Sequence, residues 1–143
     1  MSSSTLIIFG GAFEPTEVSQ HLGLVPWHSW RKGEKQSHLC KDDSIIDLGT
    51  AKWSGWKHKL PDELTTQPLE TQLEAWCKYL RPREHGLQII QNLAENIHLD
   101  CSIASSSSTA SLVVSPAVQK TLSQLGVSLV VTFYTCLEPD HAT

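Results

Sequence analysis

The chain carries the same short pattern near both ends: a hydrophobic strand, a proline that opens a helix and a Leu-Gly pair that closes it. The first copy reads "LIIFGGAFEPTEVSQHLG" and the second "SLVVSPAVQKTLSQLG", and further β-forming residues follow each copy. Proline is favoured at the first position of a helix and glycine directly after its end. Two β-α-β units of this kind predict an α+β two-layer sandwich of ferredoxin-like type, with the helices on one face of a mostly antiparallel sheet.

The middle and the end of the chain show clear periodic patterns. In "PLETQLEAWCKYLRP" the apolar residues recur at helical spacing, which predicts an amphipathic helix, and a second helix is expected over residues 83–96. "NIHLDCSIAS" alternates apolar and polar residues and predicts a half-buried strand. "SLVV" is expected to form another strand, followed by a helix that begins after Ser115 and by a final strand in "VSLVVTFYT".

The remaining segments predict loops and one hairpin. Residues 34–56 are expected to form two β segments joined by a turn at 41–43, where "KDDS" supplies short polar side chains. "LVPWHSWRKGE", residues 61–68 and the serine run 105–108 are expected to be loops. We predict one domain over residues 1–143, with 136–143 as a frayed tail.

Composition bears on the class of partner. With 11 basic and 15 acidic residues the formal net charge is −4, so no overall positive field draws the chain to nucleic acid or to an anionic membrane. A run of about 18 apolar residues, the length that a transmembrane helix needs, is not present. "MSSSTLIIFGG" lacks a basic leader and a long hydrophobic region, which favours a cytoplasmic protein. With no coiled-coil heptad or unassigned apolar stripe, we expect a monomer when the protein is free.

The cysteines are far apart and form no C-x-x-C pair, which favours reduced thiols, three of them packed as small hydrophobes. A zinc site is the alternative: His38 with Cys40 and His98 with Cys101 would supply four ligands if their two strands were adjacent. Their spacing matches no known finger or ribbon pattern. We therefore predict no metal and no cofactor.

Recognisable catalytic signatures are missing. The chain contains no G-x-S-x-G elbow, phosphate-binding loop, dinucleotide-binding turn or H-E-x-x-H helix. A Cys40–His58 nucleophile pair is conceivable, but a chain with four cysteines and seven histidines offers many such pairs by chance. We predict no catalytic residue and no enzyme activity.

The strongest binding signal is a pair of tryptophan motifs. "WHSWRKGEK" begins at Trp27, and "WSGW" repeats its W-x-x-W spacing at Trp53. Exposed indoles beside basic groups are typical of interface hot spots, whereas buried ones would belong to the core. We expect Trp27 and Trp53 to point inward and fasten the loop to the sheet. The predicted partner-binding residues are Trp27, His28, Trp30, Arg31, Lys32, Asp42, Asp43 and Trp56.

The order of these features resembles the bacterial domain-of-unknown-function family DUF4279. The resemblance rests on "FEPTEVSQHLGLVP", the "RKGE" turn, "GTAKWSGW", the helix pair and the terminal "LSQLGVSLVVTFY". The family has no assigned enzyme activity, and its members are similar in size and style to the small acidic immunity proteins encoded beside bacterial polymorphic toxins. The resemblance implies a stoichiometric inhibitor that binds and blocks a cognate toxin, encoded by the adjacent gene. The alternative is a small-molecule binding module whose pocket is lined by the four tryptophans.

Overall fold

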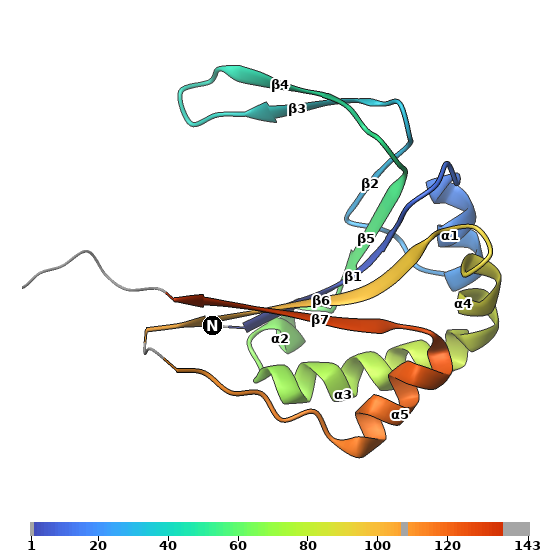
Figure 1. The fold of residues 1–143 in the computed structure, drawn as a ribbon, viewed down its shortest axis with the longest axis vertical. Coiled ribbons are helices and arrows are strands. Elements are labelled where there is room, and N and C mark those ends of the chain that lie inside the picture. The colour runs from blue at the N-terminus through green and yellow to red at the C-terminus, as the bar shows by residue number, and fades with distance from the viewer. Residues whose placement is uncertain (1, 107–108, 136–143) are drawn as a thin grey trace, which may run out of the picture.

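The computed structural model describes residues 2–106 and 109–135, which form one sheet, a set of helices on one of its faces and a separate hairpin (Figure 1). The sheet has five described strands in the order β2-β5-β1-β6-β7, and β3 and β4 form the hairpin. The elements in chain order are β1 (Ser2–Phe9), α1 (Pro15–Leu22), β2 (His28–Trp30), β3 (Lys35–Leu39), β4 (Ile45–Thr50), β5 (Gly55–Lys59), α2 (Asp62–Thr65), α3 (Leu69–Leu80), η1 (Arg81–Arg83), α4 (Glu84–Ile90), β6 (Asn96–Ser105), α5 (Pro116–Leu125) and β7 (Ser128–Thr135).

The predicted α+β class is confirmed, and the chain forms two β-α-β units, but the second unit begins with β6 and not with the strand predicted in "SLVV". β6 and β7 pair in parallel and are joined through α5. In the first unit β5 lies between β1 and β2 and is antiparallel to both, so β1 and β2 run parallel without touching. Both helices begin at a proline and end at a glycine in the left-handed conformation, Gly23 at φ 66° and Gly126 at φ 71°. Ser115 caps α5, because its hydroxyl accepts a hydrogen bond from the Val118 amide at 3.2 Å.

Alternate residues of the central strands face the helices and form the core. Leu6 and Ile8 of β1 and Leu99 of β6 are completely buried. The predicted amphipathic helix is α3, and its apolar stripe lies against the sheet with Leu73 and Trp76 inside. Each fully buried side chain of this kind contributes about 1.5–3 kcal/mol relative to the exposed state. The core therefore lies entirely between the sheet and its helical layer.

One polar network is buried in this core. The Ser4 hydroxyl donates to Gln72 Oε1 at 2.6 Å and accepts from Trp76 Nε1 at 2.8 Å. Gln72 Nε2 donates to the Gln67 carbonyl at 2.9 Å. Each of these side chains has a partner, so burial leaves no unpaired polar atom here and the cost of desolvation is offset. The network joins the start of β1 to α3.

Two short strands were not predicted. β2 lies in the segment expected to be a loop, and β5 follows Trp53, where the second β segment was expected to end. β5 has one fully buried apolar side chain, Trp56, and otherwise histidine and lysine, so the apolar pattern that indicates a strand is missing. Both strands exist because β1 offers an edge with which β5 pairs, and β5 in turn pairs with β2.

Three further expectations were wrong. "SLVV" (111–114) forms no strand, because β6 already has β1 and β7 as neighbours; Leu112 and Val114 instead pack against the core. The helix expected over 83–96 is α4, which ends at Ile90 because the chain must reverse before β6 begins. The segment 61–68 contains the short helix α2. In the serine run Ser105 ends β6, and residues 107–108, like the expected tail at 136–143, lie outside the described residues.

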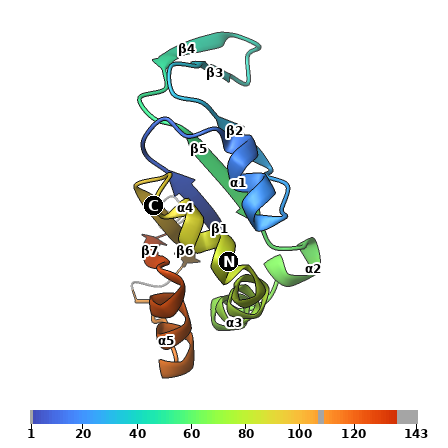
Figure 2. The same ribbon diagram turned by 90° about the vertical axis from the view of Figure 1, so that its right-hand side faces the viewer.

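The hairpin of β3 and β4 (residues 35–50) projects from the domain on the side of the sheet away from α3 and α5, and we call it the arm (Figures 1 and 2). Its predicted turn is confirmed: Asp43 has φ 66°, and the Asp42 carboxylate accepts hydrogen bonds from the Ser44 amide and hydroxyl. Among the described residues, β3 and β4 pair only with each other. No helix of the described chain is long and apolar enough to cross a membrane.

Replacing Trp56 tests which tryptophan belongs to the core. The Trp56 side chain is 0% exposed, whereas Trp53 is 44% exposed. Trp56→Ala is expected to lower the free energy of unfolding by about 3–5 kcal/mol, the usual cost of removing a large core aromatic. The matched change Trp53→Ala is expected to cost clearly less. Urea denaturation of both variants measures the difference, and equal losses would contradict this assignment.

Candidate functional site

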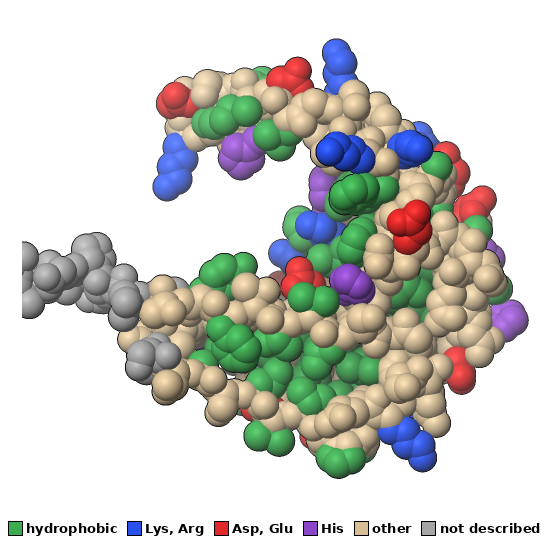
Figure 3. All heavy atoms as spheres, viewed as in Figure 1, with side chains coloured by type: hydrophobic (Ala, Val, Ile, Leu, Met, Phe, Trp, Pro, Cys, Tyr) green, Lys and Arg blue, Asp and Glu red, His purple; other side chains and the backbone are tan. Residues whose placement is uncertain are grey.

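One face of the sheet is covered by helices, and the other faces the arm across an open hollow (Figures 1 and 3). We call this second face the open face. Cross-strand partners share a face of a sheet, so the register identifies its residues. One row across the strands runs through His28, Lys57, Ile7 and His98, and the next runs through Trp30, Gly55 and Phe9.

The two tryptophan motifs meet on this face. The Trp30 indole donates from Nε1 to the Trp53 carbonyl at 2.9 Å. Its ring lies directly over Gly55, where a Cβ atom would overlap the ring. Glycine is therefore required at residue 55 by the close approach of an indole to the backbone. Trp30, the second tryptophan of "WHSW", therefore packs on Gly55 in the middle of "WSGW".

The burial of the tryptophans differs from the prediction. Trp27 and Trp53, expected to point inward, are 51% and 44% exposed, and Trp30 is half-buried. Trp56, expected to contact a partner, is fully buried and donates from Nε1 to the Ser19 hydroxyl at 3.0 Å. Trp53 and Trp56 are three residues apart, and β5 aims Trp56 into the helical layer. Trp56 is therefore removed from the candidate surface.

Two groups of three aromatic rings lie on the open face, and the hydrogen bond from the Trp30 indole to the Trp53 carbonyl joins them; together we call them the aromatic band. His98 contacts Phe9 edge-on with centroids 5.1 Å apart, and Phe9 lies 6.4 Å from Trp53. At the other end His28 lies 5.3 Å from the Trp30 ring and 5.7 Å from the Trp27 ring. The band comprises His98, Phe9, Trp53, Trp30, His28 and Trp27.

Basic side chains lie on this band. The Lys59 ammonium is 4.1 Å from the centre of the Trp27 ring, and the Lys57 ammonium is 5.7 Å from Trp27 and 5.6 Å from Trp30. These cation–π contacts hold both ammonium groups against the aromatic surface. The acidic residues Asp42 and Asp43 lie elsewhere, at the tip of the arm. The predicted partner-binding residues therefore fall into two groups of opposite charge.

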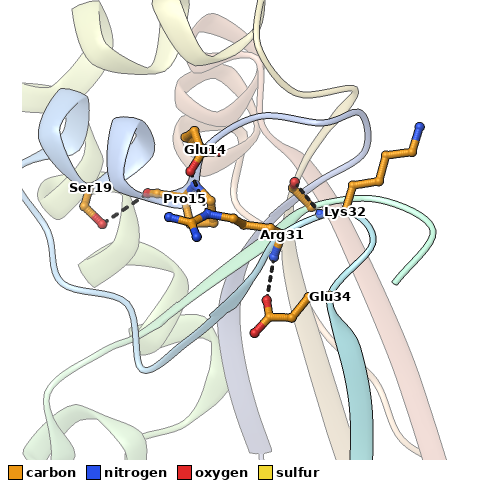
Figure 4. Close-up of polar contacts among 7 residues, drawn as sticks. Glu14, Pro15, Ser19, Arg31, Lys32 and Glu34 are labelled. Carbon is orange, nitrogen blue, oxygen red and sulfur yellow. Dashed lines mark hydrogen bonds and ion pairs between the residues drawn. The ribbon is translucent and has the colours of Figure 1, made fainter. Parts of the chain in front are cut away.

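Arg31 and Lys32 lie at the base of the arm (Figure 4). The Arg31 guanidinium pairs with the Glu14 carboxylate at 2.7 Å, and the Arg31 amide donates to Glu34 Oε2 at 2.9 Å. The Lys32 amide donates to the Ser54 hydroxyl at 3.0 Å, while the Lys32 side chain points away. Glu14 does not cap α1 with its side chain, so its role here is the pair with Arg31. These contacts fasten the arm to the sheet.

Hollows open between the arm and the aromatic band. One has a volume of about 490 Å³ and is lined by His28, Trp30 and Lys57 from the sheet and by Lys35 and Leu48 from the arm, among others. Another, of about 320 Å³, lies between the arm and the two indoles of Trp30 and Trp53. Neither is lined by Trp27 or Trp56, so the four tryptophans do not enclose one pocket.

The residues of the alternative zinc site are not brought together. His38 and Cys40 belong to the arm, whereas His98 and Cys101 belong to β6, and these two strands lie in different sheets. Cys101 faces the helices while His98 lies on the open face. Within the described residues no three potential metal ligands are grouped. The Cys40–His58 nucleophile pair is not formed either. Cys40 lies in the arm, whereas His58 lies between the rings of Trp56 and Tyr79.

Trp53 was expected to point inward and His98 was considered only as a zinc ligand. Three further residues of the surface were missed by the sequence analysis: Phe9, Lys57 and Lys59. A signal was present for each, since Phe9 alternates with the buried Leu6 and Ile8, and the two lysines alternate with Trp56 and His58. Using that signal requires knowing that residues 55–59 form a strand. Because β5 was not predicted, its outward residues could not be assigned to a face.

Thiol reactivity tests the assignment of the cysteines. Burial raises the pKa of Cys101 to about 12 and also raises that of Cys77, so both stay protonated at neutral pH. Among the three described cysteines, iodoacetamide is expected to modify the partly exposed Cys40 first in the folded protein, and Cys77 and Cys101 only after denaturation. Mass spectrometry of proteolytic peptides measures each site. Fast labelling of Cys101 in the folded chain would contradict its place in the core.

Comparison with known proteins gives one match. The family model described as "Domain of unknown function (DUF4279)" matches residues 2–135. This span contains the sheet, the helical layer, the arm and the aromatic band. No curated protein and no solved structure matches the chain. Because the match covers nearly the whole sequence, the chain belongs to the DUF4279 family.

Proposed function

We propose that this protein is a cytoplasmic immunity protein that binds a cognate bacterial toxin and blocks it without catalysis. The observation that carries the proposal is the aromatic band, which leaves large apolar rings exposed on one face of a rigid sheet. Exposed aromatic surface of this kind is characteristic of sites where proteins bind other proteins. The half-exposed rings of Trp27 and Trp53 are its most accessible indoles.

The shape of the molecule supports a blocking role. The open face and the arm stand opposite each other, so a protruding element of a partner can lie between them (Figure 3). The base of the arm is joined to the rest of the domain by the ion pair of Arg31 with Glu14 and by the hydrogen bond from the Lys32 amide to the Ser54 hydroxyl. An inhibitor that presents a preformed concave surface loses little conformational freedom on binding. Obstruction of a toxin's active site by this surface requires no chemical step.

The charge on the surface indicates what the toxin would present. Lys57 and Lys59 at the aromatic band fit carboxylates, whereas Asp42 and Asp43 at the arm tip fit basic groups. The formal net charge of −4 speeds association with a basic toxin, and the two local groups set the orientation of the complex. A toxin whose basic active-site rim is flanked by acidic residues suits both groups.

A small-molecule binding module is the second candidate. The hollow of about 490 Å³ beside Trp30, His28 and Lys57 lies within the range of about 300–1,000 Å³ typical of ligand pockets. Lys35 and Lys57 outnumber Glu34, the one acidic residue of its lining, and would favour an anionic ligand. Because only one of the four paired tryptophans lines it, we regard this function as second to toxin binding.

The first test is co-expression with the product of the adjacent gene. The proposal predicts a stable complex on affinity capture and restored growth of cells that express the toxin. Trp27→Ala is expected to weaken the complex by about 2 kcal/mol or more, as hot-spot tryptophans do, with little change in folding stability. Titration calorimetry measures the loss of affinity.

Val113→Ala is the matched control, since Val113 is 72% exposed and lies on the helical side of the molecule, between β6 and α5. It should bind toxin as the unmodified protein does. Toxin binding that Trp27→Ala leaves intact would place the contact on another face. Absence of both complex and protection would reject the immunity role, and binding of small anions with a change in tryptophan fluorescence would then favour the second candidate.

A further inference from the structure

The arm exposes apolar side chains that the described chain does not cover. Leu39, Ile45, Ile46 and Leu48 are 65%, 71%, 48% and 59% exposed. A two-stranded hairpin alone is marginally stable in water, and it is stabilised when its apolar residues pack against another surface. Every residue of β4 is exposed, so no such packing surface is provided by the described part of the same chain. The arm therefore requires a partner surface.

The charges of the arm narrow the choice of that surface. Asp42 and Asp43 lie at the turn and Asp47 lies on β4. The two lysines of the arm are Lys41, at the turn, and Lys35, at the start of β3 near the base. The hydrogen bonds from Ser44 lower the pKa of Asp42 and keep it ionised. The far half of the arm is thus apolar and acidic. Its complement is a surface that is apolar and basic.

The same chain contains a surface of that kind. The aromatic band presents the exposed Trp27 ring and the half-buried Trp30 ring, and the ammonium groups of Lys57 and Lys59 lie over these rings. The arm that complements this band starts beside it, at Arg31 and Glu34. The five residues of β3, at about 3.3 Å each, carry the tip roughly 16 Å from that base. The arm extends over the open face across the hollow (Figure 3), but Leu39 and Ile45 beside the turn are 65% and 71% exposed, so the band of the same chain does not cover the tip and the band of a second molecule can.

We propose that two copies of this chain exchange arms, so that the apolar, acidic arm of each copy lies on the aromatic band of the other. Such a contact is reciprocal, as a twofold dimer requires. It replaces the expectation of a free monomer, which considered only apolar stripes within helices. The exchange goes beyond the proposed function: it occupies the face assigned to the toxin, so toxin binding and self-association compete.

The charge complementarity allows a charge-exchange experiment on the full chain, in the absence of toxin. One variant carries Lys57→Glu and Lys59→Glu, and the other carries Asp42→Lys and Asp43→Lys. The unmodified protein is expected to have twice the mass of one chain by light scattering. Each variant alone is expected to have its dimer weakened by about tenfold or more, because like charges then face each other.

Mixing the two variants gives the decisive result. In the mixed dimer the acidic arm meets the original lysines, and the lysine-bearing arm meets the new glutamates, so both contacts are attractive again. A dimer that forms only on mixing supports arm exchange. The matched control Lys78→Glu with Lys120→Glu changes net charge by the same amount on exposed residues of α3 and α5, and it should dimerise normally.

Three outcomes would overturn the proposal: a monomeric unmodified protein over a wide concentration range, a dimer insensitive to both variants, or variants that fail to recover on mixing. Circular dichroism of each variant verifies that it is folded. Because toxin is not present, failure here leaves the toxin-binding proposal untouched. A monomer that binds toxin would show that the arm is covered by the toxin instead of by a second copy.

Discussion

The arrangement of this molecule depends on one constraint: both crossover helices lie on the same face of the sheet. Crossovers between parallel strands are almost always right-handed. β1 and β6 run in opposite directions, and their crossovers also lead in opposite directions, to β2 on one side and to β7 on the other. Reversing both the strand direction and the direction of the crossover leaves the helix on the same face, so α1 and α5 pack on one face and no described helix covers the other.

The open face carries aromatic side chains where helices would otherwise cover the sheet. A sheet face exposed to water is usually polar, but here a band of aromatic rings crosses β6, β1, β5 and β2. The interlocking of Trp30 with Gly55 and Trp53 holds this band together and also defines where the arm leaves the sheet. The contacts of Trp30 therefore link the aromatic band to the base of the arm. Uncovered apolar surface of this kind is typical of sites that bind other molecules, and it is the physical basis of both proposals.

Much of the fold was predictable because its signals are local. The ends of α1 and α5 were predicted well: Pro15 and Pro116 begin them, Gly23 and Gly126 end them, and Ser115 caps α5. The failures among the strands share a cause, since β2, β5 and "SLVV" are short segments whose state depends on strand pairing. β5 became a strand because β1 offered a free edge, while "SLVV" found both edges of β6 occupied. Pairing of this kind joins distant residues and leaves little trace in a local pattern.

The candidate surface was likewise predictable from the sequence only in part. The amino-acid sequence by itself determined the composition of the site, two W-x-x-W motifs with adjacent basic and acidic residues, and it determined the α+β class through the periodicity of its helices and strands. Only the tertiary structure decided that Trp56 is core while Trp27 and Trp53 are exposed, and that Phe9, Lys57 and Lys59 belong to the same surface. The direction of a side chain is local, but the face it occupies depends on which side of the sheet the helices cover.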